Sequence, residues 1–285
     1  MAGRLPPAAA TWIGRRLGDL GYVLTPARRR IALENLAQAF PDSTPTARQR
    51  LCRGSYQHLG LMAMELAALL ARPAEETLAR IRIDGLEHLR AVMESHGRAL
   101  LLTAHLGNWE LLAAASRLTP YRLSVVARPL DARWLDGLAI RIRGRTGVDL
   151  IDKREALRPV LRALTGGGMV GILLDQNTAR SEGVFVPFFG RPASTSKGIA
   201  LLALRTATPI LPTFIRRQPD GTHRVTIRSA LTVVDGVASG SAVAGLTARC
   251  TEAIEAAIRE NPDQWLWIHE RWRTRPAAER AGSVG

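Results

Sequence analysis

Short aliphatic segments alternate with helical patterns from Arg80 to Glu260, and this alternation constrains the fold more than any other feature. The segments with strand character are Ile81–Asp84, Ala99–Thr103, Arg122–Ala127, Val170–Leu174, Ile210–Arg216 and His223–Arg228. Helical patterns cover Leu86–Ser95, Glu110–Leu118, Arg133–Arg145, Glu155–Thr165, Ser196–Thr206 and Gly245–Glu260. Short apolar strands separated by helices are typical of a largely parallel sheet covered on both faces. We therefore expect an α/β fold with a largely parallel central sheet flanked by helices.

The amino-terminal part, Thr11–Leu70, is predicted to be helical, with a stop at Phe40-Pro41-Asp42. The second helix, Thr46–Leu70, ends in the nearly apolar run HLGLMAMELAALLA, which suits a buried helix or one that rests on lipid. No apolar stretch approaches the ~20 residues that cross a bilayer. We expect a membrane-proximal helical hairpin (residues 1–75), an α/β core (76–276) and a frayed tail (277–285), within one structural domain.

The chain has 285 residues, of which 46% are hydrophobic, enough to bury a full core. Its two cysteines, Cys52 and Cys250, have no spacing typical of a disulfide framework or a metal site, which fits a reducing compartment. Met1–Ala10 contains two prolines and lacks the apolar region and cleavage site of a signal peptide.

The formal net charge of +14 suits three partners: nucleic acid, an anionic membrane, or an acidic protein or substrate. Most of the excess comes from scattered arginines, so a solvated basic surface explains part of it. A basic nucleic-acid-binding protein is the alternative from another functional class. Against it, the sequence has no RNP pattern, zinc finger or helix-turn-helix signature, and only 5% of its residues are aromatic.

The stretch LLTAHLGNWELL, Leu101–Leu112, carries His105 past the end of an expected strand and Glu110 into the next helix. In parallel sheets, ligands gather at the carboxyl ends of strands. Residues five apart in one helix point in different directions, but a turn through Leu106-Gly107-Asn108 can fold Glu110 back beside the imidazole. A carboxylate there would hold the histidine tautomer that abstracts a proton.

The same short pattern has a plain structural interpretation. Glu110 can complement the helix dipole, and His105 can be a hydrogen-bonded loop histidine. The spacing is not that of HExxH, so a zinc protease is excluded.

Seven segments, the first of them within the stretch just described, follow one another along the chain. They are HLGNWE, ARPLD (Ala127–Asp131), RIRGRTG, GILLDQN (Gly171–Asn177), VPFFGRPAST (Val186–Thr195), PILP (Pro209–Pro212) and DQWLWIHERWRTRP (Asp263–Pro276). Together with the opening RRRIALENLAQAFPD, they resemble the late acyltransferases of lipid A biosynthesis (lauroyl/myristoyl type), a branch of the lysophospholipid acyltransferases. The resemblance runs from about Trp12 to Pro276 and implies a glycerolipid-acyltransferase-like fold.

The resemblance implies roles for individual residues. His105 and Glu110 match the family's H-x₄-D/E catalytic pair, and Asp175 matches an essential acidic position. Arg143 best matches a functional arginine, with Arg141 and Arg145 as neighbouring alternatives. Arg128 falls in an Arg-Pro motif and is expected to contact substrate. Asn108 is expected to support binding or catalysis.

Each assignment has a structural alternative: Asp175 can cap a turn, and Arg143 can belong to a solvated helix face. Phe188, Phe189 and Trp109 are candidates for the wall of an acyl-chain pocket, although Val186–Gly190 can equally be a tight strand turn. Three tryptophans and one histidine near the carboxyl terminus are assigned to packing and structure: Trp265, Trp267, Trp272 and His269.

By resemblance, the chain transfers an acyl group from a thioester, carried by acyl carrier protein or coenzyme A, to a hydroxyl of a membrane glycolipid, a lipid A precursor. The alternative acceptors are a phosphatidylinositol mannoside or a lysophospholipid. Because the sequence has no G-x-S-x-G elbow or Cys-His pair, we expect no covalent acyl-enzyme, and we expect no cofactor or metal.

The amino-terminal segment WIGRRLGDLGYVL departs from the family's usual hydrophobic anchor, because Arg15, Arg16 and Asp19 interrupt it. We therefore expect peripheral or monotopic attachment to the cytoplasmic face of the bacterial inner membrane.

Overall fold

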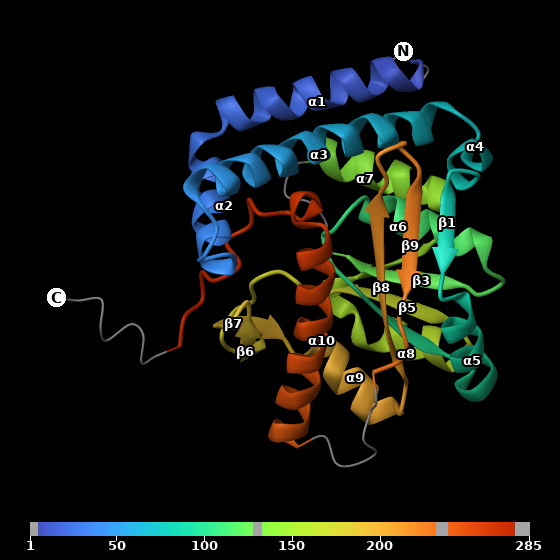
Figure 1. Ribbon diagram of the computed structural model, residues 1–285. Coiled ribbons are helices and arrows are strands. Elements are labelled where there is room, and N and C mark those ends of the chain that lie inside the picture. The colour runs from blue at the N-terminus through green and yellow to red at the C-terminus, as the bar shows by residue number, and fades with distance from the viewer. Residues whose placement is uncertain (1–4, 128–132, 232–238, 277–285) are drawn as a thin grey trace.

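The computed structural model describes residues 5–127, 133–231 and 239–276, and its centre is a seven-stranded sheet (Figure 1). The strands are β1 (Ile81–Asp84), β2 (Ala99–Thr103), β3 (Leu123–Ala127), β4 (Asp149–Asp152), β5 (Met169–Leu173), β8 (Ile210–Arg217) and β9 (His223–Ile227). Their order across the sheet is β1-β9-β8-β2-β5-β3-β4. All neighbours are parallel except β8 and β9, so β1 and β9 run opposite to the other five. The predicted α/β fold with a mostly parallel sheet is confirmed.

Alternate residues of the central strands enter two separate cores, one on each face of the sheet. In β2, Ala99 packs into one core, while Leu100 and Leu102 pack into the other. This period of two is what a strand buried on both faces requires. Helices α5 (Leu86–His96), α6 (Trp109–Ala115) and α7 (Arg133–Thr146) cover the first face. Helices α8 (Leu157–Thr165), α9 (Gly198–Thr206) and α10 (Gly240–Glu260) cover the second.

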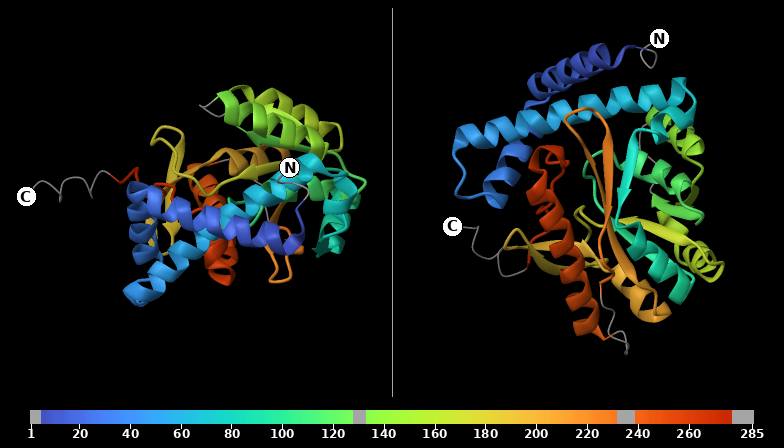
Figure 2. Two further views of the ribbon diagram at one scale, coloured as in Figure 1. Left: turned by 90° about the horizontal axis from the view of Figure 1, so that it is seen from above. Right: turned by 45° about the vertical axis from the view of Figure 1, so that its right-hand side comes forward.

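Three long helices precede the sheet: α1 (Pro7–Leu24), α2 (Pro26–Ala39) and α3 (Pro45–Ala71), followed by the short α4 (Ala74–Leu78). Each long helix begins at a proline, whose missing N–H costs nothing at that position. Helices α1 and α3 lie side by side across one end of the sheet (Figures 1 and 2). The predicted amino-terminal helices are therefore present. However, α1 packs mainly against α3 and not against α2, the next helix in the chain. The boundary at residues 75/76 stays a prediction.

Glycines allow the close approach of α1 to α3. A Cβ at Gly18 would overlap the backbone of Tyr56 and Gln57, and one at Gly60 would overlap the backbone of Gly14. The two helix backbones therefore touch without intervening side chains, so α1 is a fixed part of the fold.

Three strands were not predicted: β4 and the two-stranded antiparallel hairpin of β6 (Gly183–Phe188) and β7 (Arg191–Ser196). The β4 sequence, DLID, is short and charged because it forms the sheet edge. The hairpin turns at Phe189 and Gly190, both with positive φ, so the turn is confined to the end of the Val186–Gly190 segment and its first three residues belong to β6. The tail predicted to fray, 277–285, lies outside the described residues.

Within the described ranges, no helix combines the length and the apolar character needed to cross a membrane.

Candidate active site

The ends of β2 and β5 bring a histidine and an aspartate together. These strands are parallel neighbours, with Thr103 paired to Leu173. His105 and Asp175 each follow two residues later, and Nδ1 of His105 lies 2.8 Å from Oδ1 of Asp175. The backbone N–H of His105 also donates to Oδ2 of Asp175 at 2.8 Å. Strand register therefore places this pair at the carboxyl edge of the sheet.

Asp175 is 1% exposed, yet it is held as a carboxylate. Burial raises the pKa of its carboxyl, but the positive charge that His105 carries when protonated and the hydrogen bonds donated by His105 and Trp265 outweigh burial and lower the pKa to about 2. The indole Nε1–H of Trp265 donates to Oδ2 at 2.7 Å. The carboxylate thus accepts three hydrogen bonds in a site that excludes water.

An ionised Asp175 fixes the state of the imidazole. A carboxylate only accepts hydrogen bonds, so the proton of neutral His105 is on Nδ1 and the lone pair is on Nε2. Gln176 is exposed, and its amide Nε2 lies 3.3 Å from Nε2 of His105. Trp109 packs edge-on against the imidazole, with ring centroids 5.0 Å apart. Nε2 is the atom of His105 placed to take a proton.

The expected contact between Glu110 and His105 differs from what the structure shows. Glu110 instead forms a bidentate ion pair with Arg143: Nη2 lies 2.9 Å from Oε1, and Nε lies 3.2 Å from Oε2. The reason is that α6 begins at Trp109, so Glu110 is in its first turn and faces α7. The orienting carboxylate is Asp175.

The ion pair with Glu110 distinguishes Arg143 from the two nearby arginines of α7, Arg141 and Arg145. Arg141 is exposed, and Arg145 donates to the backbone carbonyl of Leu70 at 3.2 Å. Arg128, expected from the Arg-Pro motif, lies outside the described residues.

The turn between His105 and α6 depends on Gly107 and Asn108. Gly107 has φ 61°, and a Cβ there would overlap the carbonyl oxygen of Ile215, so only glycine fits. Asn108 is fully buried, and its Oδ1 accepts from the backbone N–H of Leu111 at 3.3 Å, which caps α6. Its Nδ2 donates to Glu65 of α3 at 2.9 Å. Asn108 thus ties the start of α6 to α3, and its expected role in substrate binding or catalysis stays a prediction.

Sequence reasoning missed Glu65 and the hydrogen bond from Trp265. A lone carboxylate in the apolar run MAMELAALLA was the available signal for Glu65, because unpaired charges are not buried. Nothing in the sequence distinguishes Trp265 from the other packed tryptophans.

His269 has a structural role, as expected. Its Nε2 accepts from the backbone N–H of Asn177 at 3.0 Å, and burial lowers its pKa to about 4. It is therefore a neutral acceptor that holds the segment following Asp175.

Phe188 and Phe189 are buried among aromatic side chains. Their rings contact each other at 5.0 Å between centroids, and further contacts involve Trp265, Trp267 and Trp272. Neither residue lines either of the two cavities described below, so contact with an acyl chain stays a prediction at these positions.

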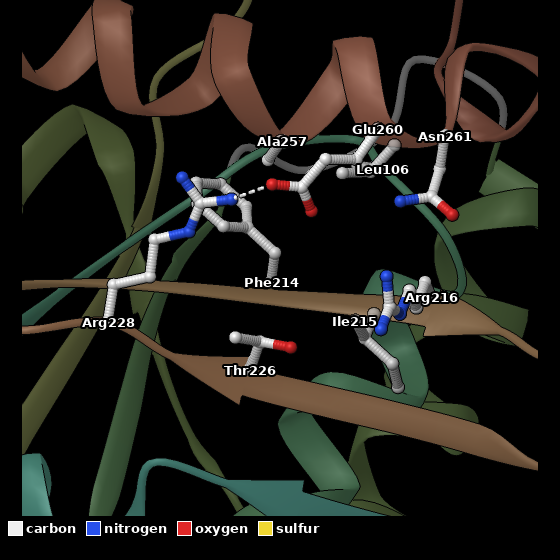
Figure 3. A pocket seen from close by; sticks show the side chains of 9 residues that line it. All are labelled: Leu106, Phe214, Ile215, Arg216, Thr226, Arg228, Ala257, Glu260 and Asn261. Atoms are coloured by element: carbon white, nitrogen blue, oxygen red, sulfur yellow. Dashed lines mark hydrogen bonds and ion pairs between the residues drawn. The ribbon is translucent and has the colours of Figure 1, made fainter.

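Two cavities lie near the turn that joins His105 to α6. The first has a volume of about 20 Å³ between Leu106, the β8–β9 strands and α10, and Figure 3 shows Arg228 and Glu260 paired at one side of it. It holds no more than about one water molecule. The second, of about 130 Å³, is lined by α1, α3 and the β8–β9 hairpin, including Leu61, Met64 and Ala68. In the part of the chain that the structure describes, no group of three His, Cys, Asp or Glu residues is placed to hold a metal ion.

Comparison with known proteins identifies the family of the chain. Residues 1–274 match the family model for the bacterial lipid A biosynthesis acyltransferases. The lipid A biosynthesis lauroyltransferase of Escherichia coli K12 is 26% identical over 96% of this chain and 88% of its own. The palmitoleoyltransferase of the same organism is 26% identical over 97% and 89%. A lipid A biosynthesis acyltransferase of Haemophilus influenzae is 27% identical over 95% and 86%. The chain is an acyltransferase that belongs to the bacterial lipid A biosynthesis acyltransferase family.

Proposed function

We propose that this enzyme transfers a fatty acyl group from an acyl thioester to a hydroxyl of a lipid A precursor. Membership of the family supports this reaction. The observation that carries the proposal is the 2.8 Å contact between His105 and Asp175, which leaves a basic Nε2 at the carboxyl edge of the sheet.

In the proposed mechanism, the acceptor hydroxyl first displaces the amide of Gln176 from Nε2 of His105. Nε2 then takes the proton of that hydroxyl. The hydroxyl oxygen attacks the thioester carbonyl carbon and forms a tetrahedral intermediate. Asp175 stabilises the imidazolium that results. The carbon–sulfur bond then breaks, the ester forms, and His105 returns the proton to the leaving thiolate. No covalent acyl-enzyme is formed.

Glu110 and Arg143 act together in the substrate site. Glu110 holds the guanidinium of Arg143 in one orientation, and Arg143 remains partly exposed. A planar guanidinium binds phosphate oxygens bidentately. We assign Arg143 to contact with an anionic group of a substrate, and Arg128 to the same role by the family's motif.

The proposed donor is acyl carrier protein, with coenzyme A as the alternative carrier. The net charge of +14 supports docking of an acidic carrier and adhesion to anionic lipid.

The outer face of α1 supports peripheral attachment to the cytoplasmic face of the inner membrane. Its exposed large apolar residues are Trp12, Leu17, Leu20, Val23 and Leu24, and Arg15 and Arg16 are also exposed. An apolar ridge with adjacent arginines suits insertion at the level of lipid headgroups.

The acceptor is identified by mass spectrometry of lipid extracts from cells that lack the gene, carry it, or carry His105→Ala. The proposal expects lipid A species that lack one acyl chain in the deletion and the variant. A missing acyl group on a phosphatidylinositol mannoside or a lysophospholipid would assign the enzyme to that acceptor, and unchanged lipids would contradict the proposal.

A further inference from the structure

Glu65 is a carboxylate from α3 with three partners, one in the turn Leu106–Asn108 that joins His105 to α6, which we call the catalytic turn, and two in the β8–β9 hairpin. Its Oε1 lies 2.7 Å from Nε of Arg217 and 3.2 Å from Nε2 of His223, and its Oε2 lies 2.9 Å from Nδ2 of Asn108. Its side chain is 19% exposed. Burial raises the pKa of Glu65, but these partners outweigh burial and lower the pKa to about 2. An ionised Glu65 therefore accepts on both oxygens.

The bond to Glu65 decides which way the amide of Asn108 points. The Nδ2 group donates to Glu65, which leaves Oδ1 to cap Leu111 at the start of α6. A reversed amide would bring its oxygen against the Glu65 carboxylate and its NH₂ against the N–H of Leu111. Because Asn108 is fully buried, water cannot replace either bond.

Helix α3 holds the turn at a second point. The imidazole of His58 forms a hydrogen bond with the backbone of Gly107. His58 and Glu65 are seven residues apart, two helical turns, so they project from one face of α3. The residues that follow His105 are thus fixed from the same helix at two successive positions.

We propose that Glu65 is a positioning residue for the catalytic turn. Through Asn108 it fixes the first turn of α6, and with it the Glu110–Arg143 pair, relative to His105. The expected effect of Glu65 on turnover rests on the proposed function. The expected effect of Glu65 on the backbone of α6 is independent of that function.

A role in stability alone is the competing explanation, since Glu65 also pairs with Arg217 and His223. Two substitutions, made singly and together, distinguish the positioning role from the stability role. Together they reverse the direction of the hydrogen bond between residues 65 and 108. In Glu65→Gln, the amide oxygen can serve Arg217 and His223, but its NH₂ then faces the NH₂ of Asn108. In Asn108→Asp, the cap of Leu111 survives, but two carboxylates face each other. In the double variant, the NH₂ of residue 65 donates to the carboxylate at 108, and every partner is satisfied.

The experiment measures kcat, KM, melting temperature and hydrogen–deuterium exchange of residues 105–115 in the two single variants and the double variant. Glu75→Gln, an exposed carboxylate of α4, is the matched control. The proposal expects kcat to fall about tenfold or more in each single variant, with KM within about twofold. Exchange in 105–115 becomes faster, and the double variant recovers both rate and protection.

The proposal is overturned if the single variants lower only the melting temperature and folded enzyme keeps its kcat. It is also overturned if the double variant is no better than the worse single variant. Should wild-type protein fail to transfer acyl groups at all, the proposed function fails, and the exchange measurement still decides the role of Glu65. Unchanged exchange in Glu65→Gln would then reject it.

Discussion

Asp175 contacts both the backbone N–H and the imidazole Nδ1 of His105, with each donor 2.8 Å from its own carboxylate oxygen. One side chain therefore fixes the position of the histidine backbone and the tautomer of its ring. The acidic residue closer in sequence, Glu110, is occupied by Arg143. The two carboxylates therefore have separate partners: Asp175 holds His105, and Glu110 holds Arg143.

Asp175→Asn is expected to reduce acyl transfer by about 10² to 10⁴, the range of lost general-base catalysis. Asparagine lacks the negative charge and can present its NH₂ to Nδ1, which places the ring proton on Nε2. Turnover with purified thioester donor and lipid acceptor is the measurement, compared with Glu110→Gln. If Asp175→Asn stays within about threefold of wild type while Glu110→Gln is inactive, the orienting role belongs to Glu110.

Arg143→Lys is expected to lose most activity although it retains the positive charge. The bidentate pair with Glu110 needs the planar guanidinium, which lysine cannot reproduce. Arg141→Lys, an exposed residue of the same helix, should be nearly neutral. Both variants are assayed at one fixed liposome-bound fraction. Equal acyl-transfer rates in the two variants would show that Arg143 is not part of the site.

Gly18→Ala is expected to destabilise the protein by about 1–3 kcal/mol, because the new methyl group would overlap the α3 backbone at Tyr56 and Gln57. Gly21→Ala is the matched control in α1, where the nearest atom, Cδ1 of Tyr56, is 3.4 Å away. Alanine there should be neutral or stabilising by up to about 1 kcal/mol, since alanine favours helix. Denaturant unfolding gives both values, and equal effects would contradict close backbone packing.

The free energy of unfolding is expected to fall as pH drops from about 6.5 to about 4. Burial lowers the pKa of His269 to about 4, so in this window the unfolded chain binds a proton that the folded chain does not. Stability therefore rises with pH across the window, by up to about 3 kcal/mol from this group.

His58, whose pKa burial also lowers, adds to the same slope. His269→Gln isolates the contribution of His269, because its amide oxygen can accept from Asn177 without titrating. The pH dependence should flatten in this variant. An identical slope in wild type and His269→Gln would show that His269 titrates normally.

Leu20→Gln combined with Leu24→Gln is expected to weaken binding to anionic liposomes by at least about tenfold, because both side chains belong to the exposed face of α1. Leu157→Gln changes an equally exposed leucine on α8 and should have no effect. Sedimentation with liposomes measures the bound fraction. Release of wild type by high salt or carbonate fits peripheral attachment, whereas extraction by detergent alone would indicate deeper insertion.

Much of the fold was predictable, because buried parallel strands and amphipathic helices have distinct periodicities. The limits of β1 and β2 were predicted to the residue, and each of the other predicted strands differs by one residue at one or both ends. The hairpin of β6 and β7 escaped prediction because its paired prolines, Pro187 and Pro192, argue against a strand.

The candidate site was predictable only in part. The sequence places both His105 and Asp175 just after strands, but it does not state that β2 and β5 are neighbours. Without that strand order, the nearby Glu110 was the obvious partner for the imidazole. Glu65 lies 40 positions before His105, and its contact with Asn108 depends on how α3 crosses one end of the sheet (Figure 1).

The rate of acyl transfer by folded His105→Ala decides whether this histidine is the general base. The assay supplies the acyl thioester, on acyl carrier protein or coenzyme A, and a lipid A precursor, with His96→Ala as a control at an exposed histidine. Loss of the general base is expected to lower the rate about a hundredfold or more in His105→Ala, with an unchanged melting profile, and His96→Ala should transfer acyl groups at the wild-type rate. Turnover near the wild-type rate in well-folded His105→Ala would contradict general-base catalysis by this residue.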